Sequence, residues 1–178
     1  AKLANVPVRL MNIDHPDKQG TLISTNNPSD GKCPIKVIAA KDGIISILIK
    51  SSRMLFAHGF LSKVFEVFDQ YKTSIDMITT SEIGVSVTID NSKNLEAIID
   101  DLKSFGTVSY TKEMTIISVI GSLPENSVGI QSDALSALKE IPIRMISYGG
   151  SAHNISFLVR TKDKSAALQA LNKQLFGI

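Results

Sequence analysis

The sequence predicts an α+β protein made of two similar βαββαβ repeats, the first of which is inserted into the second. Runs rich in β-branched residues alternate with stretches whose apolar residues recur at helical spacing. The order of these elements starts again at an offset of 68 residues. The second copy ends on a helix, one strand short, while a spare strand precedes the first copy. Because an unpaired sheet edge exposes backbone groups, the spare strand is expected to complete the second copy.

The first elements are two strands followed by a helix. Strands are expected at 35–40 and 44–50, separated by the turn signal KDG at 41–43. The segment 58–72 is expected to be an amphipathic helix that packs against a sheet. Its apolar stripe consists of Phe60, Leu61, Val64, Phe65 and Phe68.

The first repeat then continues with a short strand in SIDMIT, a strand in IGVSVTID, a helix and a final strand in FGTVSYT. In IGVSVTID apolar residues alternate with Gly84, Ser86 and Thr88, which is typical of a half-buried strand. The helix has an apolar stripe of its own, formed by Leu95, Ile98, Ile99 and Leu102.

The second copy has the same order of elements, apart from the missing last strand. Aligning Ile75–Ile78 with Ile143–Ile146 sets the offset of 68, and a two-residue insertion beyond Tyr148 keeps Val85 in step with Ile155. The expected elements are a strand near 114–120, a helix at 128–141, strands in IRMISY and NISFLVR, and a helix at 163–176. Such repeats have the ferredoxin-like plan, an antiparallel sheet with two helices on one face.

The composition excludes several classes of function. The 178 residues carry a net charge of only +2 and 6% aromatic residues without Trp, which disfavours nucleic-acid binding. Cys33 is the single cysteine, so no intrachain disulfide or zinc cluster is expected. No segment approaches the roughly 18 apolar residues of a membrane span, and no signal peptide is recognisable. A cytoplasmic protein without membrane contact is therefore expected.

The motifs of both repeats resemble one family. The chain is similar to the C-terminal regulatory region of aspartate kinases, with its two ACT domains, and most of all to the lysine-sensitive single-function class. The resemblance rests on Met54-Leu55, Gly59-Phe60-Leu61, Val64-Phe65 and the run SIDMITTSE (Ser74–Glu82) of the first repeat, and on Ile143–Gly149 and Ser151–Ile155 of the second. The segment VPVRLMNIDHPDKQGTLI resembles the end of the family's catalytic domain, through Arg9, Asn12 and Gly20-Thr21.

The resemblance implies a division of the chain and an activity for its parent. Residues 1–32 would be a remnant of the catalytic domain, 43–111 the effector-binding first ACT unit, and 33–42 with 112–178 the second. The parent would convert ATP and L-aspartate to 4-phospho-L-aspartate, the first step of lysine, threonine and methionine biosynthesis. The family's Lys-Phe-Gly-Gly phosphate-binding run is missing here. This chain alone is therefore not expected to be catalytic or to bind ATP and Mg²⁺, which are expected for the full-length parent.

An amino-acid effector needs N–H donors for its carboxylate and acids or carbonyls for its ammonium groups. The predicted helix start at Gly59–Leu61 offers N–H groups, and Asp76 offers a carboxylate. The resemblance implies that the effector contacts Met54, Phe56, Ala57, Phe60, Leu61, Ser74, Ile75, Asp76, Ser81 and Glu82. The resemblance around Met54 to Glu82 favours L-lysine as the effector. Close relatives carry His and Ser where this chain has Phe56 and Ala57, so a hydroxyl contact is lost and threonine stays open.

These residues also have ordinary structural roles. Phe60 and Leu61 fit a helix core, Asp76 could be a strand-edge charge paired with a lysine, and Ser81-Glu82 could be a solvated turn. Arg144 occupies the position of Asp76 in the second repeat, where a cation would repel an ammonium ligand. Only the first repeat is therefore expected to bind effector, and the second is expected to serve dimer contacts.

The predicted function is feedback control. The effector would bind between first repeats across a homodimer interface and favour an inactive state of the attached kinase domain. The alternatives are a threonine-regulated kinase fragment, or a stand-alone ACT module for amino-acid sensing or dimerisation. A small enzyme on this scaffold finds no support, because no acid/base or nucleophile constellation is present.

Overall fold

The computed structural model describes residues 2–24, 34–51, 58–123 and 128–177, and the chain divides into two compact bodies. The smaller body, residues 1–34, contains a short 3₁₀ turn (Lys2–Ala4) and the strands β1 (Val8–Leu10) and β2 (Thr21–Ile23), which pair antiparallel. Arg9 Nη1 donates a hydrogen bond to the carbonyl oxygen of Gln19 at 2.8 Å, which holds the segment between β1 and β2 against β1.

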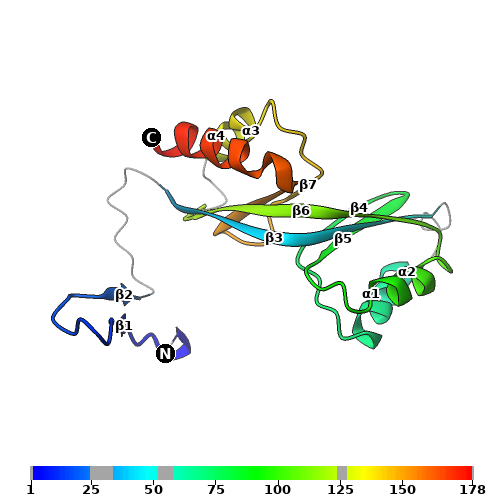
Figure 1. Cartoon of the computed structure of the whole chain (residues 1–178), viewed down its shortest axis with the longest axis horizontal. Coiled ribbons are helices and arrows are strands. Elements are labelled where there is room, and N and C mark those ends of the chain that lie inside the picture. The colour runs from blue at the N-terminus through cyan, green and yellow to red at the C-terminus, as the bar shows by residue number, and fades with distance from the viewer. Residues whose placement is uncertain (1, 25–33, 52–57, 124–127, 178) are drawn as a thin grey trace. The chain divides into compact units, whose positions relative to one another are not determined.

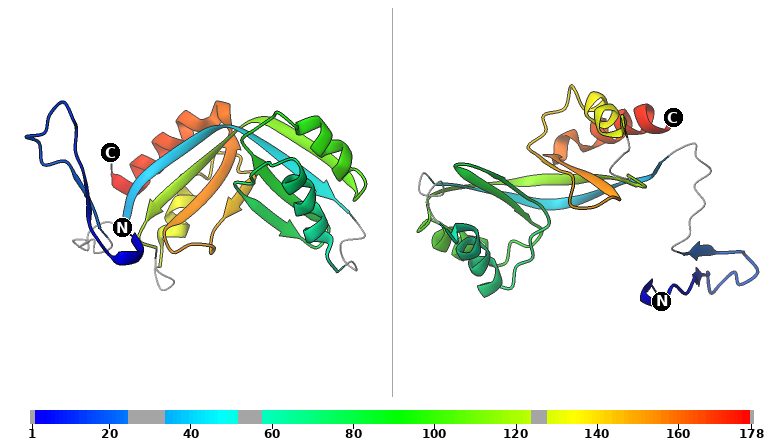
Figure 2. Two further views of the ribbon diagram at one scale, coloured as in Figure 1. Left: turned by 90° about the horizontal axis from the view of Figure 1, so that it is seen from below. Right: turned by 180° about the vertical axis from the view of Figure 1, so that it is seen from behind.

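The larger body, residues 35–178, is built on one six-stranded antiparallel sheet with the order β4-β5-β3-β6-β8-β7 (Figure 1). Its strands are β3 (Ile35–Lys50), β4 (Ile78–Ser81), β5 (Gly84–Ile89), β6 (Thr107–Gly121), β7 (Met145–Ser147) and β8 (Asn154–Arg160). Its helices are α1 (Phe60–Gln70), α2 (Leu95–Leu102), α3 (Ile130–Ala137) and α4 (Lys164–Phe176), the last preceded by the 3₁₀ turn η3 (Thr161–Asp163). Figure 2 shows α1 and α2 over one half of the sheet and α3 and α4 over the other.

The two long strands β3 and β6 run through both repeats. The C-terminal half of β3 pairs with β5 and with the beginning of β6, as in Ile47↔Val87 and Ile47↔Tyr110. The N-terminal half of β3 pairs with the end of β6, as in Ile38↔Val119, and β6 then pairs with β8. The spare strand at 35–40 therefore completes the second repeat. This confirms the predicted insertion of the first repeat into the second.

The prediction of a turn at 41–43 is wrong, because β3 continues through it as one strand. Asp42 and Gly43 instead form a β-bulge: they lie between the pairs Lys41↔Ile116 and Ile44↔Met114, opposite a single residue of β6. Gly43 has a left-handed backbone, with φ +74°. An Asp-Gly pair suits either a turn or a bulge, and the long-range pairing with β6 decides between them.

A second bulge lies on β6, on the other side of the pair Ile44↔Met114. Between this pair and Ser46↔Thr111, Lys112 and Glu113 lie opposite a single residue of β3. Glu113 also has a left-handed backbone, with φ +57°. Glu113 is the repeat equivalent of Gly43 at an offset of 113 − 43 = 70 residues rather than 68, because the residues that follow them, Ile44 and Met114, pair with each other. The strands predicted separately at 105–111 and 114–120 are consequently one strand, β6. The predicted repeat boundaries at 43 and 112 fall at these two bulges.

Other elements are shorter than the sequence predicts. The helix expected at 128–141 spans only Ile130–Ala137, and the strands expected in SIDMIT and IRMISY begin at Ile78 and Met145. Upstream of β7, Pro142 has no N–H group to donate to a strand ladder. Isolated backbone hydrogen bonds join the upstream segments to the sheet. Asp76 N–H donates to Thr88 and Thr88 N–H donates to Met77, both at 2.9 Å, and Arg144 N–H donates to Leu158 at 2.8 Å.

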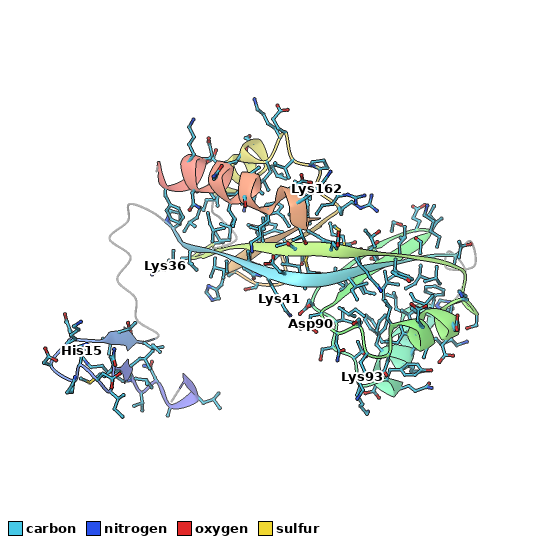
Figure 3. All side chains as sticks on the ribbon, viewed as in Figure 1. His15, Lys36, Lys41, Asp90, Lys93 and Lys162 are labelled. Carbon is cyan, nitrogen blue, oxygen red and sulfur yellow. The ribbon has the colours of Figure 1, made fainter. Side chains whose placement is uncertain are left out.

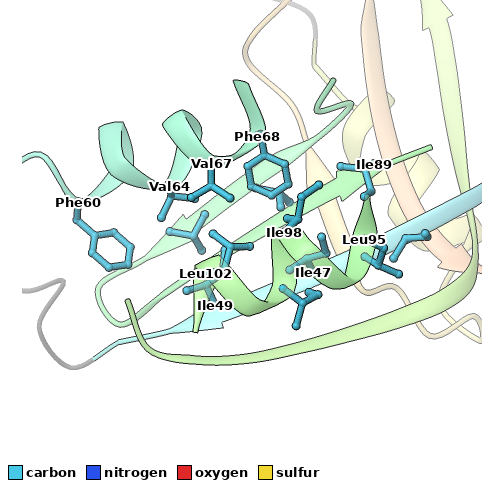
Figure 4. Close-up of a cluster of buried hydrophobic side chains, with 14 residues drawn as sticks. Ile47, Ile49, Phe60, Val64, Val67, Phe68, Ile89, Leu95, Ile98 and Leu102 are labelled. Carbon is cyan, nitrogen blue, oxygen red and sulfur yellow. The ribbon is translucent and has the colours of Figure 1, made fainter. Parts of the chain in front are cut away.

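Each repeat has its own core between sheet and helices. The predicted apolar stripes of α1 and α2 face each other and the sheet, with Phe68 and Leu102 fully enclosed (Figure 4). A corresponding core in the second repeat contains Phe157 and Leu171. Phe65, predicted to belong to the stripe, is 40% exposed.

A third apolar cluster lies on the sheet face opposite the helices. It consists of Ile44, Met77, Met114, Ile116, Met145 and Leu158. Met77 and Met145 are repeat equivalents, as are Ile44 and Met114, so the cluster joins the same positions of both repeats. It also explains why Thr88, predicted on a solvated face, is fully buried: its hydroxyl oxygen accepts a hydrogen bond from Met77 N–H at 2.9 Å.

Candidate effector site

One part of the predicted site lies at the N-terminal end of α1. The helix begins at Phe60 after Gly59, whose backbone is left-handed (φ +78°) and which supplies no side-chain cap. The first N–H groups of a helix lack partners within it and favour an anion. Phe60 is 8% exposed, and its ring packs edge-on against Phe105 at 6.3 Å, whereas Leu61 is 37% exposed. Phe60 therefore has the structural role predicted for it, and Leu61 is accessible to a ligand.

The turn between β4 and β5 lies at the same end of the first repeat. Ser81 closes β4, and its hydroxyl donates to the carbonyl oxygen of Gly84 at 3.3 Å. Glu82 is exposed in the turn. The N–H of Ser51, which follows β3, donates to the carbonyl oxygen of Ile83 at 2.9 Å. The turn is thus fixed beside the end of β3. Met54, Phe56 and Ala57 lie outside the described residues.

Asp76 lies at the opposite end of β4 and already binds an ammonium group. Lys41 Nζ is 2.7 Å from Asp76 Oδ1 and 2.8 Å from Asp90 Oδ2. Figure 3 shows Lys41 and Asp90 at this junction of the repeats. The Asp76 side chain is 24% exposed, against 47% for Lys41 and 43% for Asp90. The pairing of Asp76 with a lysine, which the sequence left open as a structural role, is therefore present.

The ion pairs shift the ionisation of their members. Hydrogen bonds to Asp76 and then to Asp90 raise the pKa of Lys41 above its ordinary value of 10.5, although slight burial opposes this. The Lys41 ammonium group lowers the pKa of Asp90 below 3.8. Lys41 is therefore fully charged at neutral pH.

Within one chain the predicted residues form two groups rather than one. Phe60, Leu61, Ser81 and Glu82 lie at one end of the first repeat. Ser74, Ile75 and Asp76 lie at the other, where Ser74 is exposed and Ile75 packs on the core. The five residue steps from Asp76 to Ser81 span about 16 Å of extended chain, so no single amino acid contacts both from the same chain.

The second repeat carries the opposite charge at the equivalent positions. Asp76 and Arg144 make matching backbone hydrogen bonds, to Thr88 and Leu158 respectively. By the same correspondence Asp90 is equivalent to Arg160, and Lys41 is equivalent to Thr111. In the ladder of β3 and β6, Lys41 lies opposite Ile116, and Thr111 lies opposite Ser46. Two carboxylates around a lysine in the first repeat are thus replaced by two guanidinium groups in the second.

Sequence reasoning identified Asp76 and Arg144 but missed Lys41, Asp90 and Arg160. Lys41 was missed because KDG at 41–43 was predicted to be a turn. A residue in a turn would not be expected to lie beside the strands that carry Asp76 and Asp90. Asp90 and Arg160 could have been found, since they close equivalent strands once the two-residue insertion is included.

A surface hollow of about 580 Å³ lies beside the two bulges. None of the predicted effector contacts lines it, although Asp90 does. Its lining consists of Gly43, Ile44, Ile45, Asp90, Ser92, Lys112, Glu113, Thr161 and Lys162. Within the described ranges, no cluster of three His, Cys, Asp or Glu residues could hold a metal ion, and no helix could span a membrane.

The fold and the paired repeats define the class of protein. The family model for the ACT domain matches residues 47–99 and 117–175. The chain therefore belongs to the ACT domain family, and within it to the C-terminal regulatory regions of aspartokinases. A solved structure described as such a regulatory domain, from Porphyromonas gingivalis W83, is 48% identical and aligns with a TM-score of 0.73 over 80% of this chain and 99% of its own.

Whole aspartokinases extend well beyond the matched part. The aspartokinase of Candida albicans is 33% identical over 97% of this chain, which covers 37% of that enzyme. Escherichia coli aspartokinase III, crystallised with lysine and aspartate, is 27% identical and aligns with a TM-score of 0.85 over 98% of this chain and 40% of the enzyme. The chain thus spans well under half of the length of these relatives.

Proposed function

We propose that this chain is the regulatory region of an aspartate kinase and that its first repeat binds an end-product amino acid, with L-lysine as the favoured effector. In the full-length enzyme, which makes 4-phospho-L-aspartate from ATP and L-aspartate, the effector inhibits by feedback. It does so by binding the inactive state more tightly than the active one. The similarity to aspartokinases, including an E. coli enzyme crystallised with lysine, supports this proposal.

The observation that carries the choice of lysine is the position of the Lys41 ammonium group. Asp76 and Asp90 together hold this primary ammonium group at 2.7 and 2.8 Å, and a free lysine molecule carries the same group on its side chain. In the second repeat, Arg144 and Arg160 would repel it. Effector binding is therefore assigned to the first repeat alone, within residues 43–111.

A dimer through β4 would unite the divided site. β4 is an edge strand of the described sheet, and no described strand pairs with its outer side. Antiparallel pairing of two copies about a two-fold axis between Thr79 and Thr80 would place Asp76 of one protomer opposite Ile83 of the partner subunit. Ser81 and Glu82 of one chain would then adjoin Asp76 of the other, which is consistent with an effector bound across a homodimer interface.

Residues 1–32 are proposed to be the end of the kinase catalytic domain. The alignment with E. coli aspartokinase III covers 98% of this chain, so it includes this segment. Gly20, which belongs to the Gly20-Thr21 pair of the resemblance, has a structural role, because a Cβ at this position would lie 2.3 Å from the carbonyl oxygen of Leu10. Only glycine allows this close approach of the two strands.

Isothermal titration calorimetry with L-lysine, L-threonine and L-methionine tests the effector. Lysine is expected to bind, and Asp76→Asn should weaken it about 10- to 150-fold, as for loss of a hydrogen bond to a charged group. Asp69→Asn is the matched control, because Asp69 is another first-repeat carboxylate paired with a lysine, Lys72, at 3.1 Å. Equal affinity of wild type and Asp76→Asn would contradict the site.

Two further outcomes separate the alternatives. Binding of threonine alone would keep the regulatory role and replace lysine as the effector. Binding of none of the three would favour a module that serves dimerisation only. Sedimentation velocity tests the dimer separately: a monomer at high protein concentration, with or without lysine, would contradict pairing through β4.

A further inference from the structure

We propose that Lys41 is an internal competitor of the effector, because its ammonium group occupies the carboxylate that the effector's ammonium group needs. This inference rests on the proposed function, in which Asp76 binds an amino-acid effector. Lys41 is not among the predicted effector contacts, yet it would lower the affinity of the site. Asp90 is assigned the role of holding Lys41 when the effector takes Asp76.

The competition follows from the identity of the two groups. Lys41 ends in the same primary ammonium group as a lysine effector, and it contacts Asp76 Oδ1 at 2.7 Å. A carboxylate oxygen at this distance already makes a charge-assisted hydrogen bond. An incoming ammonium group must therefore displace Lys41 from Asp76 or share the carboxylate with it, and either event costs part of the binding free energy.

Lys41 is held close to Asp76 by the fold. It pairs with Ile116 in the ladder of β3 and β6 and directly precedes the bulge at Asp42-Gly43. A tethered group competes at an effective concentration of order millimolar. Its charge is permanent at neutral pH, since its pKa is raised by Asp76 and Asp90. The wild-type site is therefore weakened in all conditions under which the effector is bound.

Asp90 remains a partner for the Lys41 ammonium group when the effector takes Asp76. Lys41 Nζ lies 2.8 Å from Asp90 Oδ2 while it contacts Asp76, so leaving Asp76 does not strand the ammonium group without a carboxylate. Loss of Asp90 would bind Lys41 to Asp76 alone and make its displacement harder. The two neighbours of Asp76 thus have opposite effects on effector affinity.

The test measures L-lysine affinity by titration calorimetry for Lys41→Met and Asp90→Asn. Lys41→Met should bind lysine about two- to fivefold tighter, the range that a partly exposed ion pair provides. Asp90→Asn should bind it more weakly. In the Lys41→Met background, Asp90→Asn should have no effect, because no competitor is left to be held.

The matched control is Lys164→Met. Lys164 forms the corresponding ion pair with Asp42 at the same bulge, with the same loss of one positive charge on substitution, but it does not contact Asp76. Its affinity for lysine should equal that of the wild type. A gain in Lys164→Met equal to that in Lys41→Met would mean that net charge alone sets the affinity, and would overturn the competition.

The failures of the two proposals are distinguishable. Lysine binding that Asp76→Asn weakens, with unchanged or weaker binding by Lys41→Met, would overturn the competition and leave the effector site intact. An equal loss with Asp90→Asn in both backgrounds would show that Asp90 binds the effector directly, and would also overturn it. Absence of lysine binding in both wild type and Lys41→Met would overturn both proposals.

Discussion

Replacing Gly43 with alanine tests the bulge that joins the two repeats. Gly43 has φ +74°, and a Cβ built there meets no atom within 4 Å, so the substitution adds strain without a steric clash with the rest of the protein. A left-handed backbone costs a residue with a Cβ about 1–2 kcal/mol. Alanine recovers about 0.4–1 kcal/mol by restricting the unfolded chain. The net expectation is a loss of about 1 kcal/mol of unfolding free energy.

The equivalent position in β6 provides the reciprocal change. Glu113 has φ +57° and is exposed, and it makes no ion pair within the described part of the chain. Glu113→Gly removes the left-handed strain and adds freedom to the unfolded chain, so the same arithmetic with opposite sign gives a gain of up to about 1 kcal/mol. The two substitutions at equivalent sites should therefore move stability in opposite directions.

Urea unfolding followed by circular dichroism measures both variants, with thermal melting as a second readout. A change of 1 kcal/mol should move the melting temperature by about 2–4 °C in a chain of this size. Wild-type stability in Gly43→Ala, or a loss of stability in Glu113→Gly, would contradict the assigned backbone strain. It would mean that the left-handed bulge geometry is not what these positions require.

Three further predictions follow from burial, packing and charge. Gly106→Ala should cost about 1–3 kcal/mol in urea unfolding, because its Cβ would lie 2.2 Å from the carbonyl oxygen of Lys50; wild-type stability would contradict that close approach. Phe68→Ala should cost about 3–5 kcal/mol, whereas the control Phe65→Ala, on the same helix but 40% exposed, should stay within about 0.5 kcal/mol; equal losses would disprove the assigned burial. Lysine neighbours lower the pKa of Asp42 and Asp90 below 3.8, so their contribution to stability is complete above that pH and is lost as the pH falls through the lower folded values. Asp90→Asn should reduce this acid sensitivity in pH-dependent unfolding, and an unchanged pH profile would argue against the ion pair.

The order of elements was predictable because it depends on local patterns. The helical stripe ending at Phe68 and the stripe containing Leu102 require only the 3.6-residue period, and both are buried as predicted apart from Leu61 and Phe65. The inserted topology was also predictable, because the second copy lacks a strand and the 35–40 segment is the available one. The structure confirms it through the pairing of β3 with both halves of β6.

The bulges and the ion pairs were not predictable from local patterns. An Asp-Gly pair accommodates a left-handed residue in a turn or in a bulge, so only the long-range partner distinguishes them. Lys41 meets Asp76 and Asp90 because three separate segments converge at the junction of the repeats. Their sequence separations carry no period that could have indicated this contact. The division of the predicted site residues between the two ends of β4 was not predictable either. The resemblance indicates which sequence positions contact the effector, but not how those positions are arranged within one chain.

A nuclear magnetic resonance titration of the ¹⁵N-labelled chain with L-lysine tests directly whether the first repeat alone binds the effector. Amide shifts should concentrate in the first repeat, at Leu61, Ile75–Asp76 and Ser81–Glu82, while Arg144 and its neighbours in the equivalent position stay unchanged. Shifts centred on Arg144 and β7, or no shifts at millimolar lysine, would contradict an effector site in the first repeat.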